Sequence, residues 1–306
     1  MTLPITGVYC ASATPVLGDL SPNLPAFAAH CQWLVAEGCD GVALLGTTGE
    51  ANSFSSAERK TILEAALTAG LQPGQLMPGT GVANIPETVD LTRHALAQGV
   101  TRVVMLPPFY YKGVTDEGLY AAYARVIEAV ADPRLQVVLY HIPQMSGVAI
   151  SHDLIERLRA AFPQTVVGIK DSAGKLDNMA AMITRFPGFS VLAGADPLLL
   201  PLMQMGGAGS ITATSNLVGR ELALVYRAAN DPAQTAAVAQ AQARIEAFRN
   251  LSNSYVQLPA IKGMIRYLTG DDGWTRMRPP LIDLSRAERA DLRAKLLTIG
   301  ATVTGN

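Results

Sequence analysis

The stretch QVVLYHIPQMSGVAISHDLIERLRAAFPQTVVGIKDS (136–172) predicts a strand, a helix and a second strand in succession. Its two ends, 136–143 and 165–172, are apolar on both faces. This is typical of parallel strands that helices cover on one side and a barrel interior covers on the other. Ser151 stands where it can cap the helix between them. The stretch therefore indicates one unit of a parallel α/β fold.

Further apolar runs of the same kind occur along the chain, with segments of helical spacing between them. They are 7–15, 40–46, 76–81, 101–108, 189–196 and 207–214. Together with the two runs above, they make eight strand-helix units in series. This is the pattern of a (β/α)₈ TIM barrel, whereas a doubly wound sheet would give a similar string with fewer units. The number of runs favours the barrel.

Helix start signals agree with this arrangement and continue beyond it. Ser55 and Glu58 have the spacing of a capping box, and Pro86 suits a first helical turn. After the last run we expect more helices than one unit needs, at 219–229, 232–250, 257–268 and after a capping box from Ser285 to Glu288. The expected domains are therefore a barrel at 1–230 and a small C-terminal helical extension at 231–306 packed on it.

Composition predicts a well-folded chain and excludes some partners. Apolar residues make up 49% of the 306 residues and charged residues 16%. The formal net charge is −1, and no run of Lys or Arg could neutralise a series of phosphates, so nucleic acid is not an expected partner. No basic region followed by an apolar run opens the chain, and no window approaches about 18 uninterrupted apolar residues. We expect a cytoplasmic protein without membrane contact.

The cysteines and histidines do not indicate a disulfide framework or a metal site. Cys10, Cys31 and Cys39 are odd in number and have no CxxC spacing, so we expect small core residues. The histidines form no HxxxH or HExxH arrangement that would put two ligands on one helical face. We therefore expect no metal.

Reactive residues at the ends of apolar runs are the candidates for chemistry, because the active site of a TIM barrel lies at the C-terminal ends of its strands. Lys170 ends an otherwise buried run and could simply reach solvent there. Alternatively, partial desolvation lowers the pKa of its ammonium group below about 10.4, and the neutral amine can attack a ketone. Tyr140 ends the preceding run and should lie on the same rim, where its phenol can donate and accept protons.

Two further segments at run ends have more than one interpretation. GTTGE (46–50) lacks the Lys-Ser/Thr ending of a phosphate-binding loop, and its glycines could serve only a tight turn. It could also offer backbone N–H groups to a carboxylate, and the hydroxyls of Thr47 and Thr48 to a proton relay. FYY (109–111) could be an aromatic patch at the barrel mouth, a subunit contact, or both.

Together these segments resemble the dihydrodipicolinate synthase and N-acetylneuraminate lyase family of class I aldolases. The resemblance runs from about residue 5 to about residue 270. Its motifs are GTTGE (46–50), PPFYY (107–111), YHIPQMSG (140–147), GIKDSAG (168–174) and LAGADPLLLPLMQMGGAGSIT (192–212). It implies an enzyme that acts on a small-molecule 2-oxo acid without a cofactor or metal, and a homotetramer built from dimers.

The resemblance also implies roles for individual residues. Lys170 would form the Schiff base, and Tyr140 would donate and accept protons. Thr47 and Thr48 would bind the pyruvate carboxylate, and Thr48 would also hydrogen-bond Tyr140. Tyr111 would reach across a dimer interface to complete the proton relay in the neighbouring subunit. Further substrate contacts are expected from Gly46, His141, Met145, Asp196, Ile211 and Ala213.

Departures from the family pattern bear on the substrate. Lysine-biosynthesis members carry an arginine two residues after the proline of the tyrosine motif, where this chain has Met145, which cannot bind a carboxylate bidentately. His141 stands where most members have Asn, and Asp196 with Pro197 replaces the Asp-Glu pair of sialic-acid lyases. Both of those activities are disfavoured, which leaves 2-oxo-3-deoxy sugar acids and related hydroxy-oxo acids.

The expected reaction joins Lys170 to C2 of pyruvate or of a 2-oxo-3-deoxy acid, and then breaks or makes the C3–C4 bond. A dehydratase would use the same Schiff base but remove water, and the sequence does not separate the two. A non-catalytic barrel that only binds a small acid is a rival from another class, and a metal-dependent aldolase is a further one.

Overall fold

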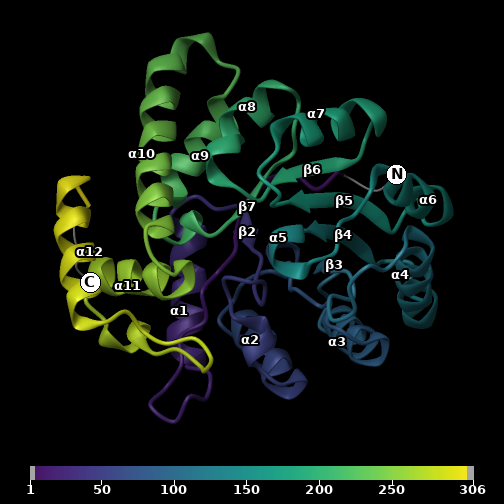
Figure 1. The fold of residues 1–306 in the computed structure, drawn as a ribbon, viewed down its shortest axis with the longest axis horizontal. Helices are drawn as coiled ribbons and strands as arrows, with labels where there is room; N and C mark the ends of the chain where they lie inside the picture. Colours follow the sequence, from purple (N-terminus) through teal and green to yellow (C-terminus); the bar gives the residue numbers. More distant parts are fainter. Residues whose placement is uncertain (1–3, 302–306) are drawn as a thin grey trace.

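The computed structural model describes residues 4–301, in which parallel strands form a central barrel with helices around it (Figure 1). In this part of the chain, seven strands form one sheet in the order β2-β1-β7-β6-β5-β4-β3. Their bounds are β1 Gly7–Cys10, β2 Gly41–Val42, β3 Arg102–Met105, β4 Gln136–His141, β5 Val166–Asp171, β6 Ser190–Ala193 and β7 Gly209–Thr212.

The predicted strand at 76–81 lies between β2 and β3 and closes the barrel. The backbone N–H of Met77 donates to the carbonyl of Val42 over 2.9 Å, and that of Thr80 donates to the carbonyl of Val104 over 3.1 Å. Pro78 has no N–H to donate, so the segment pairs through isolated bridges instead of a regular ladder. The TIM barrel is confirmed, while the prediction of eight regular strands is wrong at this one.

Helices cover the outside of the barrel, and the predicted start signals are confirmed. Ser55 and Glu58 form a capping box, Pro86 lies in the first turn of its helix, and the Ser151 hydroxyl accepts the N–H of Leu154 over 3.0 Å. The helices over this part are α1 Leu24–Ala36, α2 Ser56–Thr68, α3 Ile85–Ala97, α4 Asp116–Val130, α5 Pro143–Ser146, α6 His152–Ala161, α7 Leu176–Arg185, α8 Leu199–Gln204 and α9 Gly219–Ala228. Short 3₁₀ turns lie at Ala51–Ser53, Pro73–Gln75, Asp196–Leu198, Thr214–Asn216, Pro232–Gln234 and Asp272–Thr275.

The C-terminal helices are α10 Thr235–Asn253, α11 Gln257–Thr269 and α12 Arg286–Thr298, and they lie on one side of the barrel (Figure 1). Arg278, in the link before α12, donates to the carbonyls of Leu20 and Ser53 over 2.7 Å each and pairs with Glu58 of α2. The extension is therefore held to the segments that follow β1 and β2. The predicted boundary at residue 230 stays a prediction, and the outer limits at residues 1 and 306 lie outside the described residues.

Strand alternation divides the core into two layers. Val137 and Leu139 of β4 pack outward against the helices, and Val138 and Tyr140 point into the barrel with side chains from the other strands. The three cysteines are free and buried, as predicted. From residue 4 to residue 301, every helix is too short or too polar to cross a bilayer.

Candidate active site

Lys170 and Tyr140 lie side by side at the ends of neighbouring strands. They are direct partners in the pairing of β4 with β5, so both side chains point to the same face. The Lys170 Nζ lies 4.1 Å from the centroid of the Tyr140 ring. Their residues are only 5% and 3% exposed. The predicted pairing of an amine with a phenol on one rim is therefore present in the structure.

Thr47 supplies the hydrogen bond that orients the Tyr140 phenol. Its Oγ1 lies 3.2 Å from the Tyr140 Oη. The loop that carries it is a tight turn, in which the N–H of Glu50 donates to the carbonyl of Thr47 over 3.0 Å. The expectation that Thr48 makes this bond is a misassignment by one residue, because the turn directs the preceding side chain toward the phenol.

The pKa of the Tyr140 phenol is lowered from its ordinary value. Burial by itself raises it, but the charge of Lys170 and hydrogen bonds with Thr47, Lys170 and Ser172 favour the phenolate and together outweigh burial. A more acidic phenol gives up and recovers its proton closer to neutral pH. Tyr140 is thereby suited to act as both general acid and general base.

A cavity of about 540 Å³ opens above these residues, at the C-terminal ends of the strands. Residues from the strand ends form its inner part, which we call the cavity floor: Thr47, Tyr140, Lys170 and Ser172. Residues from loops and from α10 and α11 form what we call the outer wall: Asn52, Met145, Arg249, Val256, Gln257 and Leu281. The predicted contact residues that line the cavity are Gly46, Thr47, Thr48, Tyr140, Met145, Lys170, Ile211 and Ala213.

His141 does not join the residues that line the cavity. It follows Tyr140 on β4, and successive side chains of a strand point to opposite faces, so its ring lies on the helix side. Its Nδ1 accepts the backbone N–H of Ile150 over 3.1 Å, which fixes the segment before α6. The prediction of a direct substrate contact at His141 does not fit this position.

Asp196 is also absent from the cavity lining, and its partner Arg249 lines the cavity instead. It is fully buried, and one carboxylate oxygen accepts the hydroxyl of Thr214 over 2.9 Å. The same oxygen lies 3.5 Å from the Arg249 guanidinium. Burial raises the pKa of Asp196, with Arg249 and the hydroxyls of Thr212 and Thr214 acting against that rise. Asp196 thus holds Arg249, and it is Arg249 that faces the cavity.

Tyr111 lies at the molecular surface, away from the cavity lining. It is 71% exposed and packs edge-on against Tyr110, which is 73% exposed. Phe109 of the same segment does line the cavity. The role predicted for Tyr111 in a neighbouring subunit stays a prediction.

Several residues of the site were not predicted from the sequence. Ser172 follows Lys170 by two positions and shares its side of the chain, so strand alternation could have found it. Arg249 and Lys262 come from the C-terminal helices, and no motif indicated them.

Glu50 joins the loop that carries Thr47 to the C-terminal extension through a buried ion pair. Its carboxylate contacts the Lys262 ammonium of α11, and the two side chains are 0% and 2% exposed. The Lys262 Nζ also donates to the carbonyl of Arg276 over 3.0 Å. Burial lowers the pKa of Lys262, while Glu50 acts against that fall. Glu50 itself has a left-handed backbone with φ of 55°. The turn that carries Thr47 is therefore held from outside the barrel.

Within residues 4–301, no group of three or more His, Cys, Asp or Glu side chains has the arrangement to hold a metal ion.

Comparisons with known proteins identify the family. The dihydrodipicolinate synthetase family matches residues 4–299. A protein described as an uncharacterized DapA-like lyase, from Chloroflexus aurantiacus, is 36% identical over 302 residues, which are 97% of this chain and 98% of that one. A 4-hydroxy-tetrahydrodipicolinate synthase from Acidovorax sp. is 33% identical over 218 residues, which are 71% of this chain and 72% of that one.

Solved structures show the same fold at similar length. Dihydrodipicolinate synthase from Agrobacterium tumefaciens superposes with a TM-score of 0.87 and 28% identity, covering 95% of this chain and 99% of that one. A prophage protein of the dihydrodipicolinic acid synthase family from E. coli K12, solved in complex with pyruvate, superposes with a TM-score of 0.89 and 26% identity. The superposition covers 97% of this chain and 99% of that one.

A TIM barrel with a buried lysine and a tyrosine at adjacent strand ends defines a lyase of the class I aldolase type, which works through a Schiff base. The family model matches nearly the whole chain and identifies a particular family within this class. The chain belongs to the dihydrodipicolinate synthetase family.

Proposed function

We propose that this enzyme binds pyruvate or a 2-oxo-3-deoxy acid as a Schiff base on Lys170 and breaks or makes the C3–C4 bond. The observation that carries the proposal is the buried contact between Lys170 and Tyr140, with the amine 4.1 Å from the ring centroid at the floor of a cavity. A nucleophilic amine needs a partner that moves protons, and here the partner is the neighbouring strand's phenol.

The first steps form the Schiff base. The neutral amine of Lys170 adds to C2 of the oxo acid, and the former carbonyl oxygen becomes a hydroxyl. Tyr140 delivers a proton to that hydroxyl, which leaves as water. Thr47 holds the phenol in position through the 3.2 Å contact. The hydroxyls of Thr47 and Thr48 and the backbone of Gly46 are proposed to bind the carboxylate.

The next steps cleave the substrate. The C4 hydroxyl gives its proton to the Tyr140 phenolate, the C3–C4 bond breaks, and an aldehyde leaves. The electrons of the broken bond enter the protonated imine and give a pyruvate enamine. Protonation at C3 and hydrolysis then release pyruvate and the Lys170 amine. The lowered pKa of Tyr140 supports this exchange of roles.

A dehydratase that uses the same Schiff base is a second candidate. The floor residues serve both reactions, since Tyr140 can receive a C4 hydroxyl proton or protonate a departing hydroxyl. Synthesis of 4-hydroxy-tetrahydrodipicolinate remains the less favoured candidate, because Met145, which lines the cavity, cannot form a bidentate pair with a carboxylate.

The proposed assembly is a homotetramer made of dimers, with Tyr111 at the dimer interface. The exposure of two adjacent tyrosines, Tyr110 and Tyr111, supports an interface at this surface. In that arrangement Tyr111 would extend the proton relay into the neighbouring subunit. The proposed location is the cytoplasm, and no nucleic-acid partner is proposed.

The test is to incubate the protein with pyruvate, reduce it with borohydride and map the adduct by mass spectrometry. An adduct on Lys170 is expected. Assay of pyruvate release from 2-oxo-3-deoxy acids then separates cleavage from dehydration. Binding of pyruvate by calorimetry without a reducible adduct would favour a barrel that only holds the acid. Loss of activity with EDTA, again without an adduct, would favour a metal-dependent aldolase.

A further inference from the structure

The cavity is larger than the acid that the floor would bind. A three-carbon oxo acid occupies a small part of about 540 Å³. The remaining space is bounded by the outer wall, which combines apolar side chains with the polar groups of Asn52, Arg249 and Gln257. A substrate that fills the cavity therefore extends from Lys170 toward the C-terminal helices.

Charge in the cavity is concentrated in few side chains. Of the described residues that line it, three are charged: Glu50, Lys170 and Arg249. Glu50 is neutralised by its buried ion pair with Lys262, and Lys170 is occupied by the keto group in the proposed reaction. Arg249 also has a carboxylate partner, Asp196, but that contact is 3.5 Å long, beyond ordinary hydrogen-bond length, and the Arg249 side chain is 19% exposed. Arg249 is therefore the charged group with donors left for the far end of a substrate.

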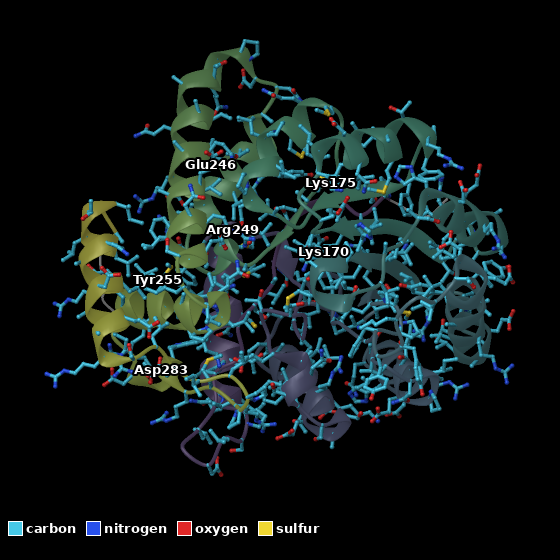
Figure 2. The ribbon with its side chains drawn as sticks, in the orientation of Figure 1. Lys170, Lys175, Glu246, Arg249, Tyr255 and Asp283 are labelled. Atoms are coloured by element: carbon cyan, nitrogen blue, oxygen red, sulfur yellow. The ribbon has the colours of Figure 1, made fainter. Side chains whose placement is uncertain are left out.

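The structure holds Arg249 in place and leaves most of its donors unused. Asp196, 0% exposed in its side chain, lies 3.5 Å from one terminal nitrogen, while the Arg249 side chain is 19% exposed. Asp196 in turn accepts the Thr214 hydroxyl at the end of β7. Across residues 4–301, the guanidinium donates no hydrogen bond, so its other N–H groups are available. In Figure 2, Arg249 lies on the barrel side of α10, and Lys170 lies nearer the barrel centre.

We propose that Arg249 selects 2-oxo acids whose far end carries a second carboxylate, and that it binds this carboxylate while Lys170 holds the keto carbon. The assignment rests on the proposed function of the site. A guanidinium offers paired N–H donors that match the two oxygens of a carboxylate, and a partly buried position strengthens that pairing. A terminal hydroxyl can accept only one such bond and carries no charge, so it is bound less well.

The experiment compares two six-carbon acids that differ at one position. 2-Oxo-3-deoxyglucarate ends in a carboxylate, and 2-oxo-3-deoxygluconate of the same stereochemistry ends in a hydroxymethyl group. Each acid competes, during a brief incubation, with labelled pyruvate for borohydride trapping on Lys170. The measured quantity is the concentration of acid that halves the label, so neither cleavage nor dehydration has to occur for a result.

The variants separate the effect of the paired guanidinium donors from the effect of the positive charge and from the effect of a substitution elsewhere on α10. Arg249→Met should weaken competition by the diacid about 10- to 100-fold, the loss expected for charge-assisted hydrogen bonds, and change the monoacid less than about threefold. Arg249→Lys keeps the ion pair with Asp196 but lacks the paired donors, so it should lose most of the diacid preference in a folded protein. Arg244→Met is the matched control, because Arg244 lies on the same helix and pairs with Glu221 outside the cavity lining.

The outcomes separate this assignment from the proposed function. A wild-type preference for the diacid of about tenfold or more, lost in both Arg249 variants with pyruvate trapping unchanged, supports it. Equal competition by the two acids, or an equal loss for both in the Arg249 variants, overturns it and leaves the Schiff-base lyase intact. Absence of any pyruvate adduct on wild-type Lys170 overturns the proposed function, and the role of Arg249 with it.

Discussion

The cavity floor and the outer wall are built in different ways. The floor residues come from the loop after β2 and from the ends of β4 and β5, and they are held by strand pairing and by the contact between Thr47 and Tyr140. The outer wall comes from loops and helices, and two of its side chains, Met145 and Val256, are 65% and 63% exposed. The floor is the rigid part that can carry a shared reaction, and the wall is the part that can change with substrate.

The largest effect is expected at the floor. Lys170→Ala removes the nucleophile, so turnover should fall by about 10³-fold or more and the borohydride adduct should disappear. Lys175→Ala, which changes an exposed lysine just before α7, is the control and should keep both. The measurements are steady-state turnover and intact-protein mass after trapping. Near-normal turnover in Lys170→Ala would contradict the assignment of the reaction to the cavity floor.

The same contrast explains how much of the molecule was predictable from its sequence. Parallel strands of a barrel end at one rim, so a lysine and a tyrosine that end neighbouring runs must meet. Alternation would also have placed Ser172 with Lys170 and turned His141 away from Tyr140. The substrate contact at His141 was predicted from its position in the family motif, without taking this alternation of side chains into account.

Of the outer wall, Met145 was predicted from its position in the family motif, but Arg249 could not be predicted in this way. Arg249 reaches the cavity through the packing of α10 on the barrel, and Asp196 supports it from the end of β6, far away along the chain. No local spacing encodes such a contact. The position of the strand at 76–81 was predicted correctly. Its irregular pairing was not, and it arises because Pro78 has no N–H to donate.

A smaller effect is expected where the extension meets the floor. Lys262→Met leaves the Glu50 carboxylate buried without its partner, so the free energy of unfolding should fall by about 3–5 kcal/mol. Lys60→Met is the matched control, because Lys60 makes a surface pair with Asp90 that contributes at most about 1 kcal/mol. Denaturant unfolding of both variants makes the comparison.

A double variant sharpens this test. Glu50→Gln combined with Lys262→Met removes the uncompensated charge, so it should be more stable than Lys262→Met alone. If Lys262→Met cost no more than Lys60→Met, the extension would not stabilise the turn that carries Thr47 through this pair.

The smallest expected effect is a shift in the pH profile set by one hydroxyl on the floor. The phenol of Tyr140 must be protonated to expel water, so activity should fall at alkaline pH, with an apparent pKa below the ordinary tyrosine value of about 10. Thr47→Val removes a hydrogen bond that lowers this pKa, so the alkaline limb of kcat/KM should move to higher pH. Thr48→Val should leave the limb in place, because Thr47 is the threonine that contacts the phenol.

A shift in Thr48→Val and none in Thr47→Val would contradict this assignment. Thr48, the residue that the family resemblance implies, would then make the hydrogen bond to Tyr140 during the reaction, and the turn held by Glu50 would present that hydroxyl instead.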